Sequence, residues 1–212
     1  MRVAVLGTGV VGQAISLRLH ELGHEVSIGT RDVTATTSRE DLPAGVDVLS
    51  FSDAAARGDL VVLAVSGTAV FDVLAAAGTA NLAGKTLIDI SNSLDFSNGF
   101  PPTLAVKDTD SLGEQIQAAY PDVRVVKSLN TLAAALMVHP ELVGNGDHTV
   151  FVSGNDAEAK QTVTDLLRSF GHRDVLDLGD ISTCRGPEMY LGLWVRLYGL
   201  IGTDMFSIKI VR

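Results

Sequence analysis

Apolar residues in this chain gather in short runs, and longer stretches with a helical spacing of apolar and polar positions separate those runs. The runs show little alternation and are rich in β-branched residues, which is typical of strands buried on both faces of a parallel sheet. Strands that alternate with helices in this way predict an α/β fold with a doubly wound, mostly parallel sheet. The expected strands are residues 3–6, 25–28, 46–51, 59–66, 85–90, 123–127, 148–153 and 173–178.

Some of the expected helices carry a residue type that fixes their first turn. Ser111 and Glu114 have the spacing of a capping box and predict a helix that starts directly after Ser111. Thr68 is expected to cap the helix that follows it. Residues 156–170 have an apolar stripe at helical spacing and predict an amphipathic helix. Residues 94–109 are rich in turn formers, and we expect a long loop there that lines a second-substrate pocket.

A glycine turn stands between the first expected strand and the helix after it. It reads Gly7-Thr8-Gly9-Val10-Val11-Gly12, and a second strand follows the helix, as a dinucleotide fingerprint requires. Gly7 permits the tight turn, Gly9 lets a pyrophosphate approach the backbone, and Gly12 lets the helix pack on the strand. The N–H groups at the helix N-terminus favour phosphates. We therefore predict a Rossmann domain in which all six residues of this turn contact a nicotinamide dinucleotide.

The end of the second strand predicts which dinucleotide is bound. NAD sites usually carry an acidic side chain there, whereas this chain has Thr30 and Arg31, whose hydroxyl and guanidinium groups suit a 2′-phosphate. We expect the carboxylate of Asp32 to point outward, because an inward carboxylate would repel the phosphate. Arg39 could also reach the phosphate, although a solvated arginine is its expected role. NADP is therefore favoured over NAD, with an ordinary surface role for Arg31 as the alternative.

Two further strand ends are expected to face the nicotinamide half of the ligand, because ligands of doubly wound sheets lie beyond the carboxyl ends of the strands. Val65 and Ser66 end one expected strand, and Asn92 follows the next strand along the chain. The short polar groups around Asn92 fit contacts to the nicotinamide ribose and fit plain turn chemistry equally well.

Composition and charge narrow the classes of function. The chain has 212 residues, of which 46% are hydrophobic, and a formal net charge of −9, which argues against a nucleic-acid or anionic-membrane surface. The single cysteine, Cys184, excludes a disulfide within the chain and fits a reducing cytoplasm. No apolar stretch reaches transmembrane length, and Arg196 interrupts the most apolar one at residues 190–201.

The C-terminal segment differs in pattern from the rest of the chain. We expect a Rossmann domain at residues 1–180 and a small C-terminal helical subdomain at residues 181–212. The helix predicted at residues 186–198 is apolar on almost every side, and helices of this kind are buried. This segment is therefore expected to pack under the active-site cleft or to form a homodimer interface.

Groups for acid–base, nucleophilic or metal chemistry are not conspicuous. The five histidines are scattered without metal-ligand spacing, no nucleophile elbow is present, and Cys184 has no obvious histidine partner in the sequence. Reduction of a simple carbonyl needs a proton donor near the nicotinamide, whereas hydride transfer between two cofactor rings needs mainly the stacking of one ring on the other. We expect the second kind of reaction, with no catalytic side chain and no metal.

Five segments of the chain stand out together: MRVAVLGTGVVG, IGTRD, KSLNT, GNDAEAKQTVTDLLRSFG with DVLDLGDIS, and the ending YLGLWVRLYGLIGTDMFSIKIVR. They resemble the bacterial branch of the NADP oxidoreductases that depend on the deazaflavin coenzyme F420. The resemblance implies reversible hydride transfer between the nicotinamide C4 and the deazaflavin C5. It also implies that Thr30 and Arg31 read the 2′-phosphate and that Asn130, Thr131 and Leu132 belong to the deazaflavin pocket. Archaeal members carry a histidine where Asn130 stands, and this chain departs from them.

These observations favour an NADP-dependent oxidoreductase that acts on coenzyme F420 or on a flavin-type acceptor. Asn130 and Leu132 are expected to contact the acceptor ring. Two alternatives stay open: an NADPH reductase for another acceptor, such as a flavin, quinone or metal chelate, and a non-catalytic NADP-binding sensor or partner protein. The expected partners are a small-molecule acceptor and a second copy of the chain, without nucleic acid or membrane.

Overall fold

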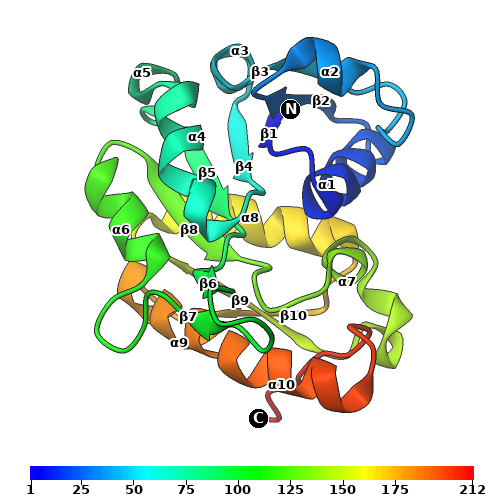
Figure 1. Ribbon diagram of the computed structural model, residues 1–212, viewed down its shortest axis with the longest axis vertical. Helices are drawn as coiled ribbons and strands as arrows, with labels where there is room; N and C mark the ends of the chain where they lie inside the picture. The colour runs from blue at the N-terminus through cyan, green and yellow to red at the C-terminus, as the bar shows by residue number, and fades with distance from the viewer.

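An eight-stranded sheet runs through the molecule, and the expected ligand-binding loops follow its strands (Figure 1). The structure, a computed structural model, describes all residues from 1 to 212. The strand order is β10-β9-β8-β5-β4-β1-β2-β3, and all neighbouring pairs are parallel except β8 with β9. The predicted doubly wound, mostly parallel sheet is thus confirmed. Its strands are β1 (Arg2–Leu6), β2 (Glu25–Thr30), β3 (Asp47–Ser50), β4 (Leu60–Leu63), β5 (Thr86–Asp89), β8 (Arg124–Ser128), β9 (Thr149–Gly154) and β10 (Asp174–Asp177).

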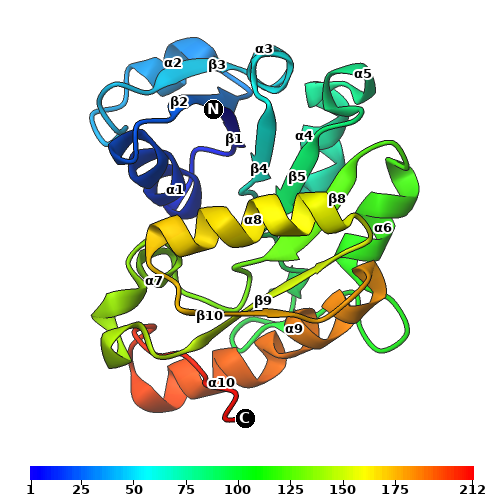
Figure 2. The same cartoon turned by 180° about the vertical axis from the view of Figure 1, so that it is seen from behind.

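Helices cover both faces of the sheet, so the core consists of two apolar layers. One layer packs α1, α7 and α8 against the sheet, and the other packs α3 to α6 against the opposite face. Figure 2 shows α8, in yellow, lying across the back of the molecule. The helices are α1 (Val10–Glu21), α2 (Val33–Thr37), α3 (Phe51–Arg57), α4 (Val70–Ala77), α5 (Thr79–Leu82), α6 (Leu112–Ala119), α7 (Ala134–Val138), α8 (Ala157–Phe170), α9 (Arg185–Met189) and α10 (Leu191–Ile201), with 3-10 turns η1 (Gly67–Ala69), η2 (Pro140–Leu142), η3 (Gly144–Gly146) and η4 (Ile181–Cys184).

Side-chain caps fix the start of two helices where the sequence predicts them. The Ser111 hydroxyl accepts a hydrogen bond from the N–H of Glu114 (3.2 Å) and donates to its carboxylate (2.7 Å), which confirms that α6 starts directly after Ser111. The reciprocal bond of a capping box is not made, because the Ser111 N–H donates to Asp110 (2.8 Å). Asp156 caps α8 by accepting from the N–H three residues on (2.7 Å). The predicted cap at Thr68 is wrong. Thr68 lies inside η1, its hydroxyl bonds the Ser66 hydroxyl (3.2 Å), and α4 starts without a side-chain cap.

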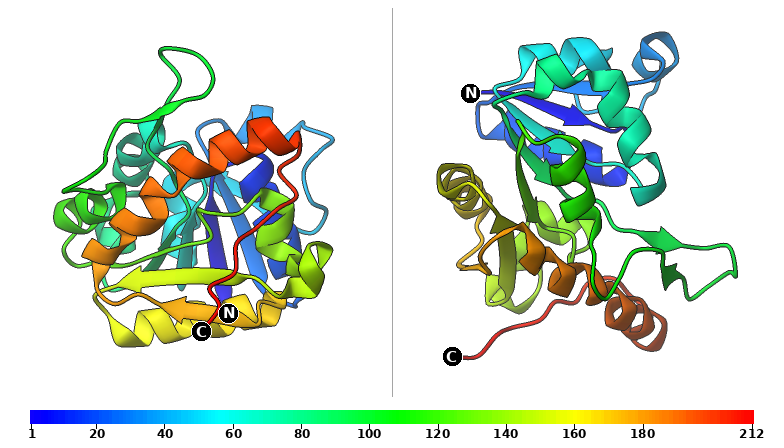
Figure 3. Two further views of the ribbon diagram at one scale, coloured as in Figure 1. Left: turned by 90° about the horizontal axis from the view of Figure 1, so that it is seen from below. Right: turned by 90° about the vertical axis from the view of Figure 1, so that its left-hand side faces the viewer.

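The segment expected as an irregular loop at residues 94–109 contains a small antiparallel hairpin instead. Its strands are β6 (Leu94–Asp95) and β7 (Thr103–Leu104). The Ser93 hydroxyl donates to the Val106 carbonyl (3.1 Å) and helps to close the base of the hairpin. Strands of two residues are too short to show an alternating pattern, so the sequence reads as a loop. Figure 3 shows the hairpin projecting from the body of the molecule beside α10.

The C-terminal residues cross the carboxyl edge of the sheet and return to its outer strands (Figure 3). The N–H of Thr149 in β9 donates to the Ile208 carbonyl (2.9 Å), and the Thr149 hydroxyl accepts from the N–H of Ile210 (3.0 Å). The segment is therefore tied to the sheet by backbone bonds at its far end. The division into domains at residues 1–180 and 181–212 stays a prediction.

Helix α10 is less buried than its composition predicts. Leu191 and Val195 are buried, whereas Leu193 and Ile201 are exposed and Leu200 is 82% exposed. The single chain therefore covers only one side of α10, and a homodimer interface on its outer side stays a prediction. No helix of this structure combines the length and the apolar character that crossing a membrane requires.

Candidate functional site

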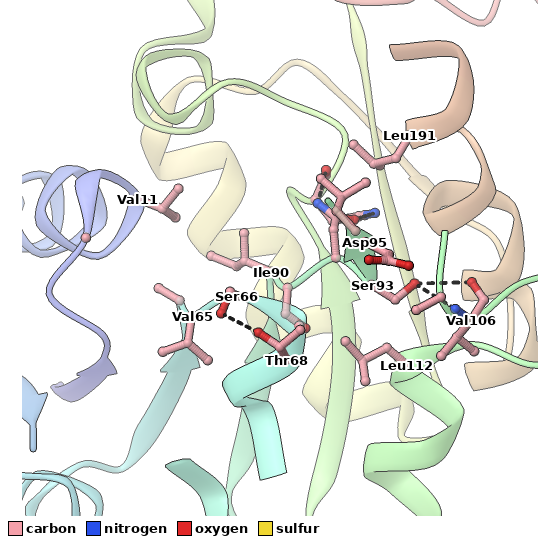
Figure 4. A pocket seen from close by; sticks show the side chains of 18 of the residues that line it. Val11, Val65, Ser66, Thr68, Ile90, Ser93, Asp95, Val106, Leu112 and Leu191 are labelled. Carbon is pink, nitrogen blue, oxygen red and sulfur yellow. Dashed lines mark hydrogen bonds between the residues drawn. The ribbon is translucent and has the colours of Figure 1, made fainter. Parts of the chain in front are cut away.

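A cavity of about 900 Å³ opens beyond the carboxyl ends of the strands, next to the point where the strand order reverses between β1 and β4. The loops after β1, β4, β5 and β8 form one part of its wall, and the hairpin and α10 complete it (Figure 4). The wall is mostly apolar. The predicted site residues that line it are Gly9, Val10, Val11, Val65, Ser66, Asn92, Asn130 and Leu132, whereas Gly7, Thr8, Gly12, Thr30 and Arg31 lie outside it.

The glycine turn after β1 leaves no room for a side chain at two of its glycines. Gly7 has a φ of +131°, and a Cβ on it would lie 2.2 Å from the Ala64 carbonyl oxygen. A Cβ on Gly12 would lie 2.1 Å from the Gly7 carbonyl oxygen, because the first turn of α1 packs directly on the loop. The fold itself therefore requires glycine at both positions, in agreement with the structural roles predicted for them.

Gly9 is different, because the fold does not require a glycine there. Its backbone is extended, with φ −77° and ψ −177°, and no other atom lies within 4 Å of a Cβ built on it. Gly9 is the N-cap of α1, where no side chain caps the helix and the first N–H groups are left for a ligand. Open space therefore lies beside Gly9 at the N-terminus of α1, so these residues fit the predicted dinucleotide, whose pyrophosphate stays a prediction here.

The end of β2 exposes one of the two predicted phosphate-binding residues and buries the other. Arg31 is exposed, and no carboxylate pairs with it. Thr30 is 7% exposed, and its hydroxyl bonds the Thr36 hydroxyl (2.8 Å) and accepts from the N–H of Asp32 (3.3 Å). The Asp32 carboxylate is exposed and caps α2 by accepting from the N–H of Ala35 (2.9 Å). Arg31 is therefore free to meet a phosphate, and Thr30 shapes the turn that presents it.

Arg39 lies against the glycine turn, although we expected a solvated side chain there. Its Nη1 donates to the Thr8 carbonyl (3.1 Å), and its Nε and Nη2 donate to the Asp41 carboxylate (2.9 and 2.7 Å). Gln13 donates to the same carbonyl (3.1 Å) and to the same carboxylate (3.2 Å). The hydrogen bonds from Arg39 and then Gln13 hold the pKa of Asp41 at about 2. A second cation besides Arg31 therefore stands beside the turn.

The loops after β5 and β8 meet through a reciprocal pair of amides. Asn92 Nδ2 donates to the Asn130 carbonyl (2.9 Å), and Asn130 Nδ2 donates to Asn92 Oδ1 (3.0 Å) and to the Pro187 carbonyl (3.1 Å). The loop after β4 joins them, because a Cβ on Gly67 would lie 2.3 Å from the Asn92 carbonyl oxygen. Asn130 is 3% exposed. It therefore holds the loops together at the same place where it lines the cavity.

The serines beside Asn92 are engaged in bonds that shape their own loop. The Ser91 hydroxyl donates to Asp89 (2.5 Å), and the Ser93 hydroxyl donates to the Val106 carbonyl (3.1 Å). Both serines also line the cavity. These bonds agree with the turn-chemistry interpretation of the serines, and contact of these polar groups with a nicotinamide ribose stays a prediction.

A buried ion cluster lies behind the cavity wall, and sequence analysis missed it because the lysine sits in an apolar strand. Lys127 Nζ donates to Asp89 (2.8 Å), to Glu188 (2.9 Å) and to the Ser91 carbonyl (2.6 Å). Glu188 also accepts the first two N–H groups of α6 (2.8 and 3.0 Å). Burial acts to lower the pKa of Lys127, but the charges and hydrogen bonds of the two carboxylates raise it above its ordinary value. The cluster ties the ends of β5 and β8 to α9.

The cysteine and two of the histidines occupy structural positions. Burial raises the pKa of the Cys184 thiol to about 11, so the thiol is not a nucleophile at neutral pH. His148 and His172 are buried and bond backbone carbonyls at 3.1 and 2.9 Å. Among the residues that line the cavity, Asp95 is the only one with an ionisable side chain.

Known proteins similar to this chain point to one family. The family described as NADP oxidoreductase, coenzyme F420-dependent, matches residues 2–93. A solved structure from Arthrobacter sp. FB24, whose name proposes an F420-dependent NADP reductase, is 54% identical over 100% of both chains, with a TM-score of 0.97. The chain belongs to the F420-dependent NADP oxidoreductase family.

Two more distant relatives are similar to this chain over nearly its whole length. The F420-dependent NADP reductase of Methanocaldococcus jannaschii is 28% identical over 209 residues, which cover 93% of this chain and 92% of the relative. Human metalloreductase STEAP2 is 29% identical over 202 residues, which cover 93% of this chain. This chain spans only about a third, 36%, of the length of that metalloreductase.

Proposed function

We propose that this protein transfers a hydride between NADP(H) and a deazaflavin of the coenzyme F420 type. The observation that carries the proposal is Gly9, a glycine that the fold does not need and whose open side faces the uncapped N-terminus of α1. A dinucleotide pyrophosphate would fill that space and accept the N–H groups of the helix. The names of the family and of its archaeal relative support the same pair of redox partners.

The charged residues around the end of β2, where we place the adenosine, favour the binding of NADP over that of NAD. Arg31 is an exposed guanidinium without a carboxylate partner, and Arg39 donates to the Thr8 carbonyl of the glycine turn. Planar guanidinium groups bind phosphate through two parallel charge-assisted hydrogen bonds. The carboxylate of Asp32, which could bind an NAD ribose, is occupied as the cap of α2. We therefore assign the 2′-phosphate to Arg31 first and to Arg39 second.

The cavity, where we place the nicotinamide and the acceptor ring, supports hydride transfer between two flat rings. The cavity of about 900 Å³ is at the upper end of the usual range for ligand sites, and its wall is apolar apart from a few placed polar groups. Val65, Leu132 and Trp194 supply apolar surfaces on which rings can lie, while Asn92 and Asn130 fix the loops around them. A site of this kind excludes water and holds two reacting carbons close together.

In the proposed reaction the side chains bind and orient the two ligands and do not take part in the chemical step. NADPH and the deazaflavin, when bound, supply both reacting carbons, and the chain contributes binding, orientation and the exclusion of water. The glycine turn holds the pyrophosphate and Arg31 holds the adenosine phosphate. Asn130 and Leu132 line the cavity, and we assign them to contacts with the acceptor ring. No lysine, histidine or tyrosine lines the cavity, so we assign no proton-transfer role to a side chain.

The decisive experiment mixes the protein with NADPH and oxidised coenzyme F420 and follows the deazaflavin absorbance. The expected result is a loss of absorbance that depends on both NADPH and protein. Parallel reactions with a free flavin, a quinone and a ferric chelate test the alternative acceptors, the last because of the metalloreductase relatives. Reduction of one of these with coenzyme F420 untouched would overturn the proposal, and NADPH binding without turnover of any acceptor would indicate a sensor.

We further propose that two copies of the chain associate through the outer side of α10. Leu193, Leu200 and Ile201 are exposed there, and Phe100 of the hairpin contacts Tyr198 edge-on, with ring centroids 6.1 Å apart. The apolar surface therefore continues from the helix to the hairpin, and surfaces of this kind mark contact sites. Light scattering should give the mass of two chains for the native protein and of one chain for Leu200→Glu.

A reducing cytoplasm stays the expected location, since the lone cysteine is free and buried.

A further inference from the structure

The charge inside the cavity is of one sign. Asp95 is the only ionisable side chain in the wall, and it projects from the hairpin on the side opposite the glycine turn (Figure 4). The backbone N–H of Ser97 donates to its carboxylate (2.8 Å). This hydrogen bond lowers the pKa of Asp95 below its ordinary value, so the group is an anion at neutral pH. No lysine, arginine or histidine lines the cavity to balance it.

The buried cluster behind the wall adds a second excess negative charge. Asp89 and Glu188 face the single ammonium of Lys127, and the three side chains are 0%, 2% and 0% exposed. The N–H groups at the start of α6 stabilise Glu188 and offset part of its field. They are dipoles, however, and do not change the net charge of the cluster, which is one negative unit.

This cluster is attached directly to the cavity wall. Ser91 lines the cavity, and it donates its hydroxyl to Asp89 (2.5 Å) while its carbonyl accepts from Lys127 (2.6 Å). Leu112 also lines the cavity and donates its N–H to Glu188 (2.8 Å). One layer of residues therefore separates the cluster from the space in which the rings would lie. Next to an apolar wall, a buried charge at such a distance acts more strongly than it does in bulk water.

The cations that serve the nucleotide lie at the other end of the site. Arg39 bonds the Thr8 carbonyl on the glycine turn, and Arg31 follows the end of β2. Arg39 is also neutralised by Asp41 (2.7 Å). The negative charges of the 2′-phosphate and the pyrophosphate would offset the remaining positive charge of the arginines. The ring end is therefore left with two uncompensated negative charges.

We propose that this one-sided field stabilises positive charge on the nicotinamide ring, so that hydride donation by bound NADPH is more favourable on the protein than in solution, while the overall equilibrium in solution is unchanged. The inference rests on the proposed function. In that direction the dihydronicotinamide loses a hydride and becomes a cation, while the deazaflavin gains the hydride and takes one proton from water. Asp95 and the buried cluster lower the energy of the cationic ring and leave that of the neutral ring almost unchanged. The protein therefore binds NADP⁺ more tightly, relative to NADPH, than an uncharged pocket would.

The test measures the dissociation constants of NADPH, by its fluorescence, and of NADP⁺, by competition. Glu188→Gln and Asp95→Asn each remove one negative charge with little change of size. Glu188→Gln should weaken NADP⁺ relative to NADPH by about three- to tenfold, as Coulomb's law gives for a buried unit charge roughly one residue layer away. Asp95→Asn should shift the ratio in the same direction but by less, because water around the projecting hairpin screens its charge. Glu188→Asp is the matched control, because it shortens the side chain and keeps the charge. It should leave the ratio of the two constants unchanged even where both affinities fall.

The outcomes separate this inference from the function on which it rests. Equal changes in the affinities for NADP⁺ and NADPH in Glu188→Gln and Asp95→Asn would overturn the inference. The cluster would then have only the structural role of holding α9 against the ends of β5 and β8. Failure of the native protein to bind either nucleotide would overturn the proposed function instead. Should Glu188→Gln fail to fold, Asp95→Asn still decides the matter, because Asp95 lies on the projecting hairpin and outside both core layers.

Discussion

Replacing Gly9 by alanine should weaken nucleotide binding strongly without harming the fold. The backbone at Gly9 is one that alanine adopts freely, and its Cβ would meet no atom within 4 Å. Loss of backbone freedom in the unfolded chain should stabilise the variant by about 0.4–1 kcal/mol. Alanine is a poorer N-cap than glycine, which costs a similar amount of about 0.5–1 kcal/mol. The free energy of unfolding should therefore stay within about 1 kcal/mol of the native value.

The affinity for NADPH should change far more. The new methyl group occupies the space at the N-terminus of α1 in which we place the pyrophosphate, so the phosphate must retreat and lose at least one hydrogen bond from the helix. A hydrogen bond to a charged group contributes about 1.5–3 kcal/mol, which corresponds to a rise in Kd of roughly 10- to 100-fold. Fluorescence titration with NADPH measures the Kd, and thermal unfolding measures stability on the same samples.

Gly12→Ala provides the contrast, because its Cβ would lie 2.1 Å from the Gly7 carbonyl oxygen. This variant should unfold at a clearly lower temperature, whereas Gly9→Ala should not. If Gly9→Ala bound NADPH as tightly as the native protein, the pyrophosphate would not lie beside Gly9 at the N-terminus of α1, where we place it. If Gly9→Ala were as unstable as Gly12→Ala, the fold would need glycine at both positions and the main support for nucleotide binding would be lost.

Three further predictions concern charge. Arg31→Ala should weaken NADP binding by about 2 kcal/mol and leave NAD binding nearly unchanged, and equal losses for both nucleotides would remove Arg31 from the phosphate site. Arg39→Gln should shift the same NADP-to-NAD ratio in the same direction but by less, since Asp41 already holds the guanidinium. Burial lowers the pKa of His172 from 6.5 to about 4, so below pH 6.5 the unfolded chain binds a proton that the folded chain does not. The free energy of unfolding should then fall by about 3 kcal/mol as the pH drops from 6.5 to 4, and denaturant unfolding of His172→Gln should lack that part of the slope.

The parts of the fold that were predicted correctly depend on residues close together in sequence. The glycine turn, the helix start at Ser111 and the amphipathic helix α8 each consist of a local pattern, and the structure has each of them. The hairpin at residues 94–109 was missed because its two-residue strands pair without any alternation. Thr68 was misplaced because a 3-10 turn, which has no distinct sequence pattern, precedes α4.

The missed parts of the site depend on contacts between distant segments. Lys127 stands in an apolar strand, and its partner Glu188 lies in a helix much further along the chain, so no window of sequence contains both. Arg39 reaches Thr8 only because α2 and the loop after it bring the chain back across the turn. Strand ends such as Val65 and Asn92 were predictable, since parallel strands deliver their carboxyl ends to a common edge.

Both strands of the hairpin that bears Asp95 lie outside the sheet, and the hairpin meets the body only at its base and at α10, where Phe100 contacts Tyr198. Substitutions elsewhere in the hairpin can thus accumulate during evolution while the glycine turn and the central strands stay constant. A lineage of such proteins could exchange one electron acceptor for another by remodelling this appendage. Laboratory recombination of hairpins between relatives would be a direct way to retarget the enzyme.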